Sequence, residues 1–193
     1  MRLRSLIMSD SIRTFVAVKI PVPSALRPVL RSLATMNWPV SAVSPDNLHV
    51  TLKFLGNTPA ESRDTIQNQI AESVIGQSPF VLRVAGLGAF PHIDQPSVVW
   101  AGLCDVEPLV SLAQRLEAAL ESLGFARESR PFHPHLTLAR VKGRPPCELF
   151  ELLRQHANTN FGSVEIQAVE FIRSDRERDG ARYSTLLSCE LRV

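Results

Sequence analysis

The sequence is poor in two features that would each point to a class of protein. It has 3 cysteines in 193 residues, and Cys104, Cys147 and Cys189 lie far apart with no CxxC pair. We therefore expect neither a disulfide framework nor a zinc site, and a reducing cytoplasm is the simplest location. No segment reaches the roughly 18 uninterrupted apolar residues of a membrane span, so no membrane partner is expected.

The chain also has little net charge. A formal charge of +2 is too small for a long electrostatic footprint on duplex nucleic acid, so a partner should be small or held at one end. The composition, with 45% hydrophobic and 21% charged residues, is that of a globular protein. The apolar run near the N-terminus is too short for a signal peptide. We expect residues 1–12 to form a flexible extension and residues 13–193 a single domain.

What the chain does contain is one short motif in two copies. The first is His49-Val50-Thr51-Leu52, and the second is His135-Leu136-Thr137-Leu138. Both copies lie in apolar, β-prone runs, where side chains at i and i+2 point to the same face of a strand. His and Thr therefore share one face in each copy, while the apolar residues between and after them, including Phe54, are expected to face a core.

Hydrophobic periodicity and turn residues predict strands that alternate with helices. Ser24, Thr58 and Asp105 are the expected N-caps of the first three helices, and Thr58 would form a capping box with Glu61. The expected strands are 14–20, 48–55, 79–87, 97–103, 135–141, 161–167, 169–174 and 181–191, and the expected helices are 24–36, 59–75, 105–123 and 145–156. Together with the repeated motif, this order predicts an α+β fold with two pseudo-equivalent lobes whose motif strands face each other.

Two histidines on opposite walls of a cleft suit the hydrolysis of a phosphodiester. One imidazole takes a proton from water while the other donates a proton to the leaving oxygen, and the two oxygens lie in line on opposite sides of phosphorus. The hydroxyls of Thr51 and Thr137 would donate hydrogen bonds to the phosphate oxygens. A metal site is not expected, because each motif supplies one histidine and no acidic partner.

Three further residues are candidates for substrate binding. Arg140 could contact the phosphate, although strand alternation points it away from His135 unless a β-bulge intervenes. Lys53 is two residues after Thr51, so alternation places it on the face of the first motif, where it could neutralise a phosphate. It could equally be a solvent-exposed residue at the end of the strand. Trp100 could stack on a base, or lie in the core. His133 is not expected to belong to the catalytic pair. We expect it to support His135 from outside the site or to lie at the surface.

The chain resembles the two-histidine phosphoesterases, and among them the RNA 2',3'-cyclic phosphodiesterases, also named 2'-5' RNA ligases. The resemblance rests on the segments TFVAVKIP, NLHVTLKFLG, VVWAGL, SRPFHPHLTLAR and SDRERDGARYSTL. It implies two pseudo-symmetric lobes with antiparallel sheets that flank a central cleft, with the helices outside and no cofactor or metal. It also implies that His49 donates a proton to the leaving 3'-oxygen, that His135 accepts one from water, and that Thr51 and Thr137 hold the phosphate.

The implied activity is the opening of an RNA terminal 2',3'-cyclic phosphate to a 2'-phosphate, with 2'-5' ligation as the reverse reaction. The expected partners are RNA 3' ends or nucleotide cyclic phosphates, and a monomer is expected. Two alternatives stay open. One is a phosphodiesterase for a small cyclic nucleotide or a 2'-5' oligonucleotide, and the other is a non-catalytic module that binds RNA ends.

Overall fold

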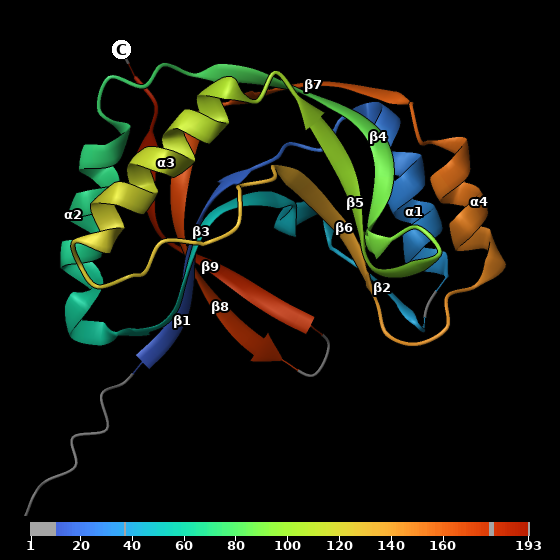
Figure 1. The fold of residues 1–193 in the computed structure, drawn as a ribbon, viewed down its shortest axis with the longest axis horizontal. Coiled ribbons are helices and arrows are strands. Elements are labelled where there is room, and N and C mark those ends of the chain that lie inside the picture. Colours follow the sequence, from blue (N-terminus) through green and yellow to red (C-terminus); the bar gives the residue numbers. More distant parts are fainter. Residues whose placement is uncertain (1–10, 37, 178–179, 193) are drawn as a thin grey trace, which may run out of the picture.

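The computed structural model describes residues 11–36, 38–177 and 180–192. It consists of two antiparallel sheets with helices on their outer sides (Figure 1). The first sheet has the strand order β3-β1-β8-β9, and its strands are β1 Ser11–Lys19, β3 His49–Pro59, β8 Ala168–Glu177 and β9 Gly180–Glu190. The helices α2 Arg63–Val74 and α3 Glu107–Glu121 pack against it.

The second sheet has the order β2-β6-β5-β4-β7. Its strands are β2 Val40–Ala42, β4 Phe80–His92, β5 Gln95–Cys104, β6 His135–Val141 and β7 Asn160–Ile166. The helices α1 Arg27–Thr35 and α4 Cys147–Gln155 cover it. The two expected lobes are therefore present, but each sheet combines strands from both halves of the chain, because β1 pairs with β8 and β4 pairs with β7.

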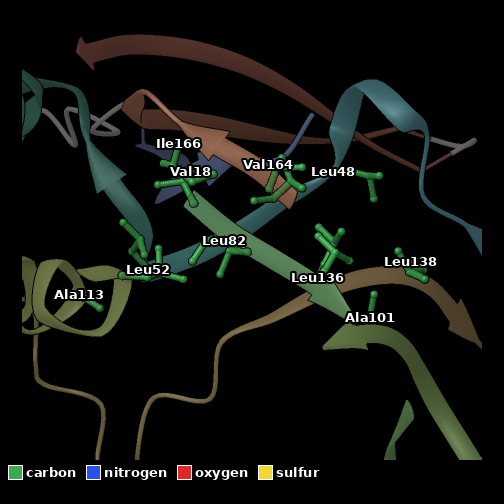
Figure 2. Packing of buried hydrophobic residues seen from close by; sticks show 14 of the residues in the cluster. Val18, Leu48, Leu52, Leu82, Ala101, Ala113, Leu136, Leu138, Val164 and Ile166 are labelled. Atoms are coloured by element: carbon green, nitrogen blue, oxygen red, sulfur yellow. The ribbon is translucent and has the colours of Figure 1, made fainter. Parts of the chain in front are cut away.

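One hydrophobic core joins the two sheets. Apolar residues of both motif strands belong to it, and Leu52 of β3 and Leu136 of β6 lie in the same cluster (Figure 2). Both are buried, as the alternation of the motif predicts. A second, small cluster of Phe15, Ala17 and Ile172 lies on the other face of the first sheet. Because the core fixes one face of each motif strand, the opposite face is free to carry the polar residues.

The expected strand over residues 135–141 is confirmed, but the predicted capping box is wrong. Thr58 lies inside β3, where it pairs with Ile12, and its hydroxyl oxygen is 2.6 Å from that of Thr14. Pairing with β1 carries the strand past residue 55, where it was expected to end, to Pro59. A 3-10 turn then precedes α2, which has no side-chain cap.

Two other expected caps are also wrong. A 3-10 turn over Ser24–Leu26 precedes α1, and no side-chain hydrogen bond caps either segment. Asp105 lies outside α3 with φ of 61°. Its carboxylate is 3.5 Å from the Nε of Arg83, so it serves as an ion-pair partner and not as a cap.

The expected N-terminal extension, residues 1–12, overlaps the first strand, which begins at Ser11. Ser11 and Ile12 already belong to β1, because they pair with Pro59 and Thr58 of β3; residues 1–10 lie outside the described residues. Among the helices that the structure describes, none has the length and apolar character needed to cross a membrane.

Candidate active site

The first motif strand carries a β-bulge directly after its His-Thr pair. Thr51 of β3 pairs with Ala17 of β1, but the next β1 residue, Val16, pairs with Lys53, so Leu52 is an extra residue. Because two consecutive residues then point the same way, the alternation shifts by one. Leu52 and Lys53 are both buried, and Phe54 is 62% exposed. The expectation that Phe54 faces the core is therefore wrong.

The second motif strand has its bulge at the equivalent position. Thr137 pairs with Trp100 of β5, and Ala139 pairs with the preceding residue of β5, so Leu138 is the extra residue. Leu138 and Ala139 are buried, and Arg140 is exposed. The bulge brings Arg140 to the face of His135, which removes the argument that alternation raised against its role.

Lys53 does not contribute to the site face. Its side chain is buried on the core side, where the Nζ atom lies 2.6 Å from Oε2 of Glu117 and donates to the carbonyl of Ala126 at 2.9 Å. The candidate role in phosphate binding is therefore wrong for Lys53, because the bulge turns the side chain toward α3.

Both motif histidines are held in the same way. Nδ1 of His49 lies 2.7 Å from the carbonyl oxygen of Asn47, and Nδ1 of His135 lies 2.8 Å from that of His133. A carbonyl only accepts, so each Nδ1 carries the proton and donates it. Each Nε2 is then left for proton transfer. His133 thus acts through its backbone, two residues before the histidine that it orients, and Asn47 does the same in the first motif.

Aromatic side chains from neighbouring strands pack against the imidazoles. The ring of His49 lies 4.9 Å from that of Phe15 and 5.2 Å, edge to face, from that of Tyr183. The ring of His135 lies 5.1 Å, edge to face, from that of Phe90. Sequence reasoning missed these three aromatic residues, since none lies within four residues of a motif and only strand pairing brings them to it.

The two imidazoles differ in their surroundings. Burial lowers the pKa of His49 below its ordinary value, the hydrogen bond to the Asn47 carbonyl opposes this, and the positive charge of Arg140 lowers the pKa further. Arg140 lies on β6 and His49 on β3, so the charge of a residue on one motif strand acts on the histidine of the other. The strands themselves come together where the sheets meet (Figure 1).

A pocket of about 200 Å³ opens beside His49. Its lining includes Lys19, whose Nζ lies 2.9 Å from Oε2 of Glu170 and 3.2 Å from the hydroxyl of Thr185. The lining residues are Lys19, Asp46, Asn47, His49, Ile172, Tyr183 and Thr185. A larger hollow of about 510 Å³ between α1 and α4 has no motif residue in its lining, so the candidate active site is the smaller pocket with the adjoining motif faces.

The two threonines lie where the motif predicts. Thr51 and Thr137 are half-buried on the faces that carry the histidines, and their hydroxyls have no hydrogen-bond partner within the part of the chain that the structure describes. Within the same residues, no group of three His, Cys, Asp or Glu side chains is arranged to hold a metal ion.

Trp100 lies outside the hydrophobic core of the described residues, and a stacking role stays a prediction. Its register with Thr137 places it on the site face, yet its indole is packed over Gly88, where a Cβ atom would lie 2.2 Å from the ring. Its ring centroid lies 5.4 Å from that of Phe90, which is 39% exposed. Phe90 is therefore the aromatic surface offered beside His135, and Trp100 supports it.

Comparison with known proteins extends these observations. The sequence profile of the 2'-5' RNA ligase superfamily matches residues 22–178. An RNA 2',3'-cyclic phosphodiesterase of Archaeoglobus fulgidus is 34% identical over 176 residues, which cover 90% of this chain and 97% of the relative. Another of Aeropyrum pernix is 37% identical over 157 residues, with coverages of 80% and 88%.

Solved structures agree with this assignment. A protein of Thermus thermophilus superposes with a TM-score of 0.76 at 28% identity, covering 93% of this chain and 98% of that chain. The E. coli protein LigT in complex with 3'-AMP superposes with a TM-score of 0.71 at 27% identity, with coverages of 94% and 99%. The match of the profile, of whole-length relatives and of the fold together shows that this chain belongs to the 2'-5' RNA ligase superfamily.

Proposed function

We propose that the protein is an RNA 2',3'-cyclic phosphodiesterase that opens the terminal cyclic phosphate to a 2'-phosphate without a metal. The observation that carries the proposal is the matched pair of histidines, each with Nδ1 bound to the carbonyl two residues earlier and Nε2 available. A binding module needs no such pair of proton-transfer groups. The names of the relatives give the substrate class.

The reaction follows from in-line displacement at phosphorus. Nε2 of His135 accepts a proton from water as the water oxygen bonds to phosphorus. The bond from phosphorus to the 3'-oxygen breaks, and Nε2 of His49 donates a proton to that oxygen. The products are a 3'-hydroxyl and a 2'-phosphate, and each proton transfer requires a distance of about 3 Å. If the 5'-hydroxyl of a second RNA attacks phosphorus in place of water, the same groups form a 2'-5' linkage as the bond to the 3'-oxygen breaks and a 3'-hydroxyl is released.

Three side chains are proposed to hold the phosphate during this step. Thr51 and Thr137 donate hydrogen bonds to its non-bridging oxygens, where negative charge builds, and such fixed donors contribute on the order of 3 kcal/mol each. Arg140 contributes a charge-assisted contact, because the bulge in β6 directs it to the site face. The lowered pKa of His49 makes it a stronger acid, which suits the donation of a proton to an alkoxide leaving group.

The remaining parts of the proposal concern the setting. RNA 3' ends are the proposed partners, and a nucleotide cyclic phosphate is the small-molecule alternative. We propose that the protein acts as a monomer in the cytoplasm, where the three unpaired cysteines stay reduced.

The central experiment is turnover of an RNA that ends in a 2',3'-cyclic phosphate, measured in excess chelator. We expect a 2'-phosphate product at an undiminished rate, and turnover that returns only with added metal would overturn the mechanism. The variants His49→Ala and His135→Ala should each lose on the order of a hundredfold or more in kcat while they keep the wild-type fold. His92→Ala is the matched control, because that histidine is exposed, lies outside both motifs and pairs with Asp94. Tight binding of the 2'-phosphate product without any turnover would instead favour a binding module.

A further inference from the structure

Three basic side chains follow one another where β6 leaves the site. Arg140 and Lys142 point the same way, because Val141 between them is buried in the core, and Arg144 follows in the loop after the strand. Arg140, Lys142 and Arg144 are exposed, and none forms an ion pair with another described residue. Three uncompensated charges therefore extend from the proposed phosphate site past the end of β6, next to the edge strand β2 of the second sheet.

The opposite side of the site is different, because Lys19, the cation that lines the pocket beside His49, is neutralised. Three of the basic side chains on β1, β8 and β9 have acidic partners, whereas Arg13 and Arg176 form no ion pair with a described residue. These pairs are Lys19–Glu170 at 2.9 Å, Arg173–Asp175 at 2.9 Å and Arg182–Glu177 at 3.5 Å. A polyanion that enters the site therefore gains more from contact with the end of β6 than from contact with Lys19, whose charge is already paired.

An exposed tryptophan lies at the same edge. Trp38 is 77% exposed and directly precedes Pro39, whose carbonyl accepts a hydrogen bond of 3.0 Å from the backbone N–H of Lys142. A Cβ atom at Gly143 would lie 3.8 Å from Cβ of Pro39. The chain that enters β2 and the chain that leaves β6 thus meet at one corner of the molecule (Figure 1).

We propose that Trp38, Lys142 and Arg144 form a binding surface for the single-stranded RNA upstream of the terminal phosphate. A base stacks on the indole of Trp38, and the two cations contact backbone phosphates, which is the combination of aromatic and basic groups that binds single strands without regard to sequence. Arg140 connects this surface to the terminal phosphate. The inference rests on the proposed function and adds that the enzyme selects RNA over free nucleotides.

Two substrates separate this surface from the active site. One is a mononucleotide 2',3'-cyclic phosphate, and the other is an RNA of about eight nucleotides with the same terminus, within the usual length range of a single-strand site. The readout is the ratio of kcat/KM for the RNA to kcat/KM for the mononucleotide. If the wild type turns over neither substrate, the proposed function fails; if it turns over both with a ratio near one, only the RNA surface fails.

Charge-removing variants test the cations. Lys142→Ala/Arg144→Ala should lower the ratio on the order of tenfold and make the plot of log Kd against log salt concentration shallower by about 1.4, since each phosphate contact to a single strand contributes about 0.7. The Kd is that of the RNA product with a 2'-phosphate end. Arg27→Ala/Arg31→Ala is the matched control, with the same charge change on exposed residues of α1, and should leave both quantities unchanged.

Aromatic variants test the stacking contact. Trp38→Ala should lower the ratio by roughly fivefold to a hundredfold without a change in the salt slope, and Trp38→Phe should restore most of it, because a phenyl ring still stacks on a base. The proposed RNA surface is overturned if Trp38→Ala or the double cation variant lowers kcat/KM for both substrates by the same factor. It is also overturned if either variant leaves kcat/KM unchanged for both substrates.

Discussion

Lys53 and Arg140 are two cations near the motifs that the tertiary structure assigns to opposite faces, and their substitution should separate stability from activity. Lys53 is buried against Glu117 and the Ala126 carbonyl, whereas Arg140 is exposed beside His49. We predict that Lys53→Ala destabilises the protein with little effect on the folded enzyme. Arg140→Ala should do the reverse.

The expected size of the stability effect follows from burial. The side chain of Lys53 is 3% exposed and that of Glu117 is 22% exposed. Removing Lys53 leaves the Glu117 carboxylate with little solvent and no cationic partner, only the backbone N–H of Glu128 at 3.3 Å, which costs about 3 kcal/mol. In a chain of 193 residues this lowers Tm by roughly 6–12 °C. The double variant Lys53→Met/Glu117→Leu should recover much of the loss, because no charge remains unpaired.

The effect of Arg140→Ala should appear in the chemistry. Loss of a charged hydrogen bond to phosphate costs roughly 1.5–3 kcal/mol, which corresponds to a fall in kcat/KM of roughly 10- to 150-fold. As an exposed residue without an ion-pair partner in the described part of the chain, Arg140 should change Tm by no more than about 2 °C. Lys53→Ala, assayed at a temperature where it is folded, should keep kcat within about threefold of the wild type.

Thermal unfolding and steady-state turnover of a 2',3'-cyclic phosphate measure both quantities on the same samples. The reasoning is refuted if Lys53→Ala keeps its Tm and loses activity like Arg140→Ala, because Lys53 would then face the substrate. A large fall in Tm for Arg140→Ala would likewise show that its side chain is part of the packed structure.

Two further predictions follow from the site. If His49 is the proton donor, kcat/KM should fall with rising pH along a limb with a midpoint below about 6.5, because burial and the charge of Arg140 lower the pKa of His49. Arg140→Ala should move that midpoint to higher pH in the slower enzyme. A midpoint that stays in place or moves lower would contradict the assignment. Gly88→Ala places a Cβ atom 2.2 Å from the indole of Trp100, so it should displace that ring and cost roughly 1–3 kcal/mol. In a Trp38→Phe background Trp100 is the sole tryptophan of the chain, and an unchanged fluorescence spectrum would contradict the packing.

Much of the architecture was predictable from local patterns. The strand over 135–141 and the burial of Leu52 and Leu136 follow from alternation, since one face of each motif strand must pack on a core. The capping box at Thr58 failed because pairing with β1 extended the strand through that residue. A local helix signal was overridden by backbone pairing with a segment more than 40 residues away in the chain, since Thr58 pairs with Ile12.

The sequence by itself determined the motif, the shared face of each His-Thr pair and the kind of chemistry that two such faces support. Only the tertiary structure decided which neighbours join them. A β-bulge forms when a strand pairs out of step with its partner, so it depends on two segments at once, and no single run of residues reveals it. The bulges at Leu52 and Leu138 bury Lys53 and bring Arg140 to the site, and strand pairing places aromatic residues of other strands against the two histidines.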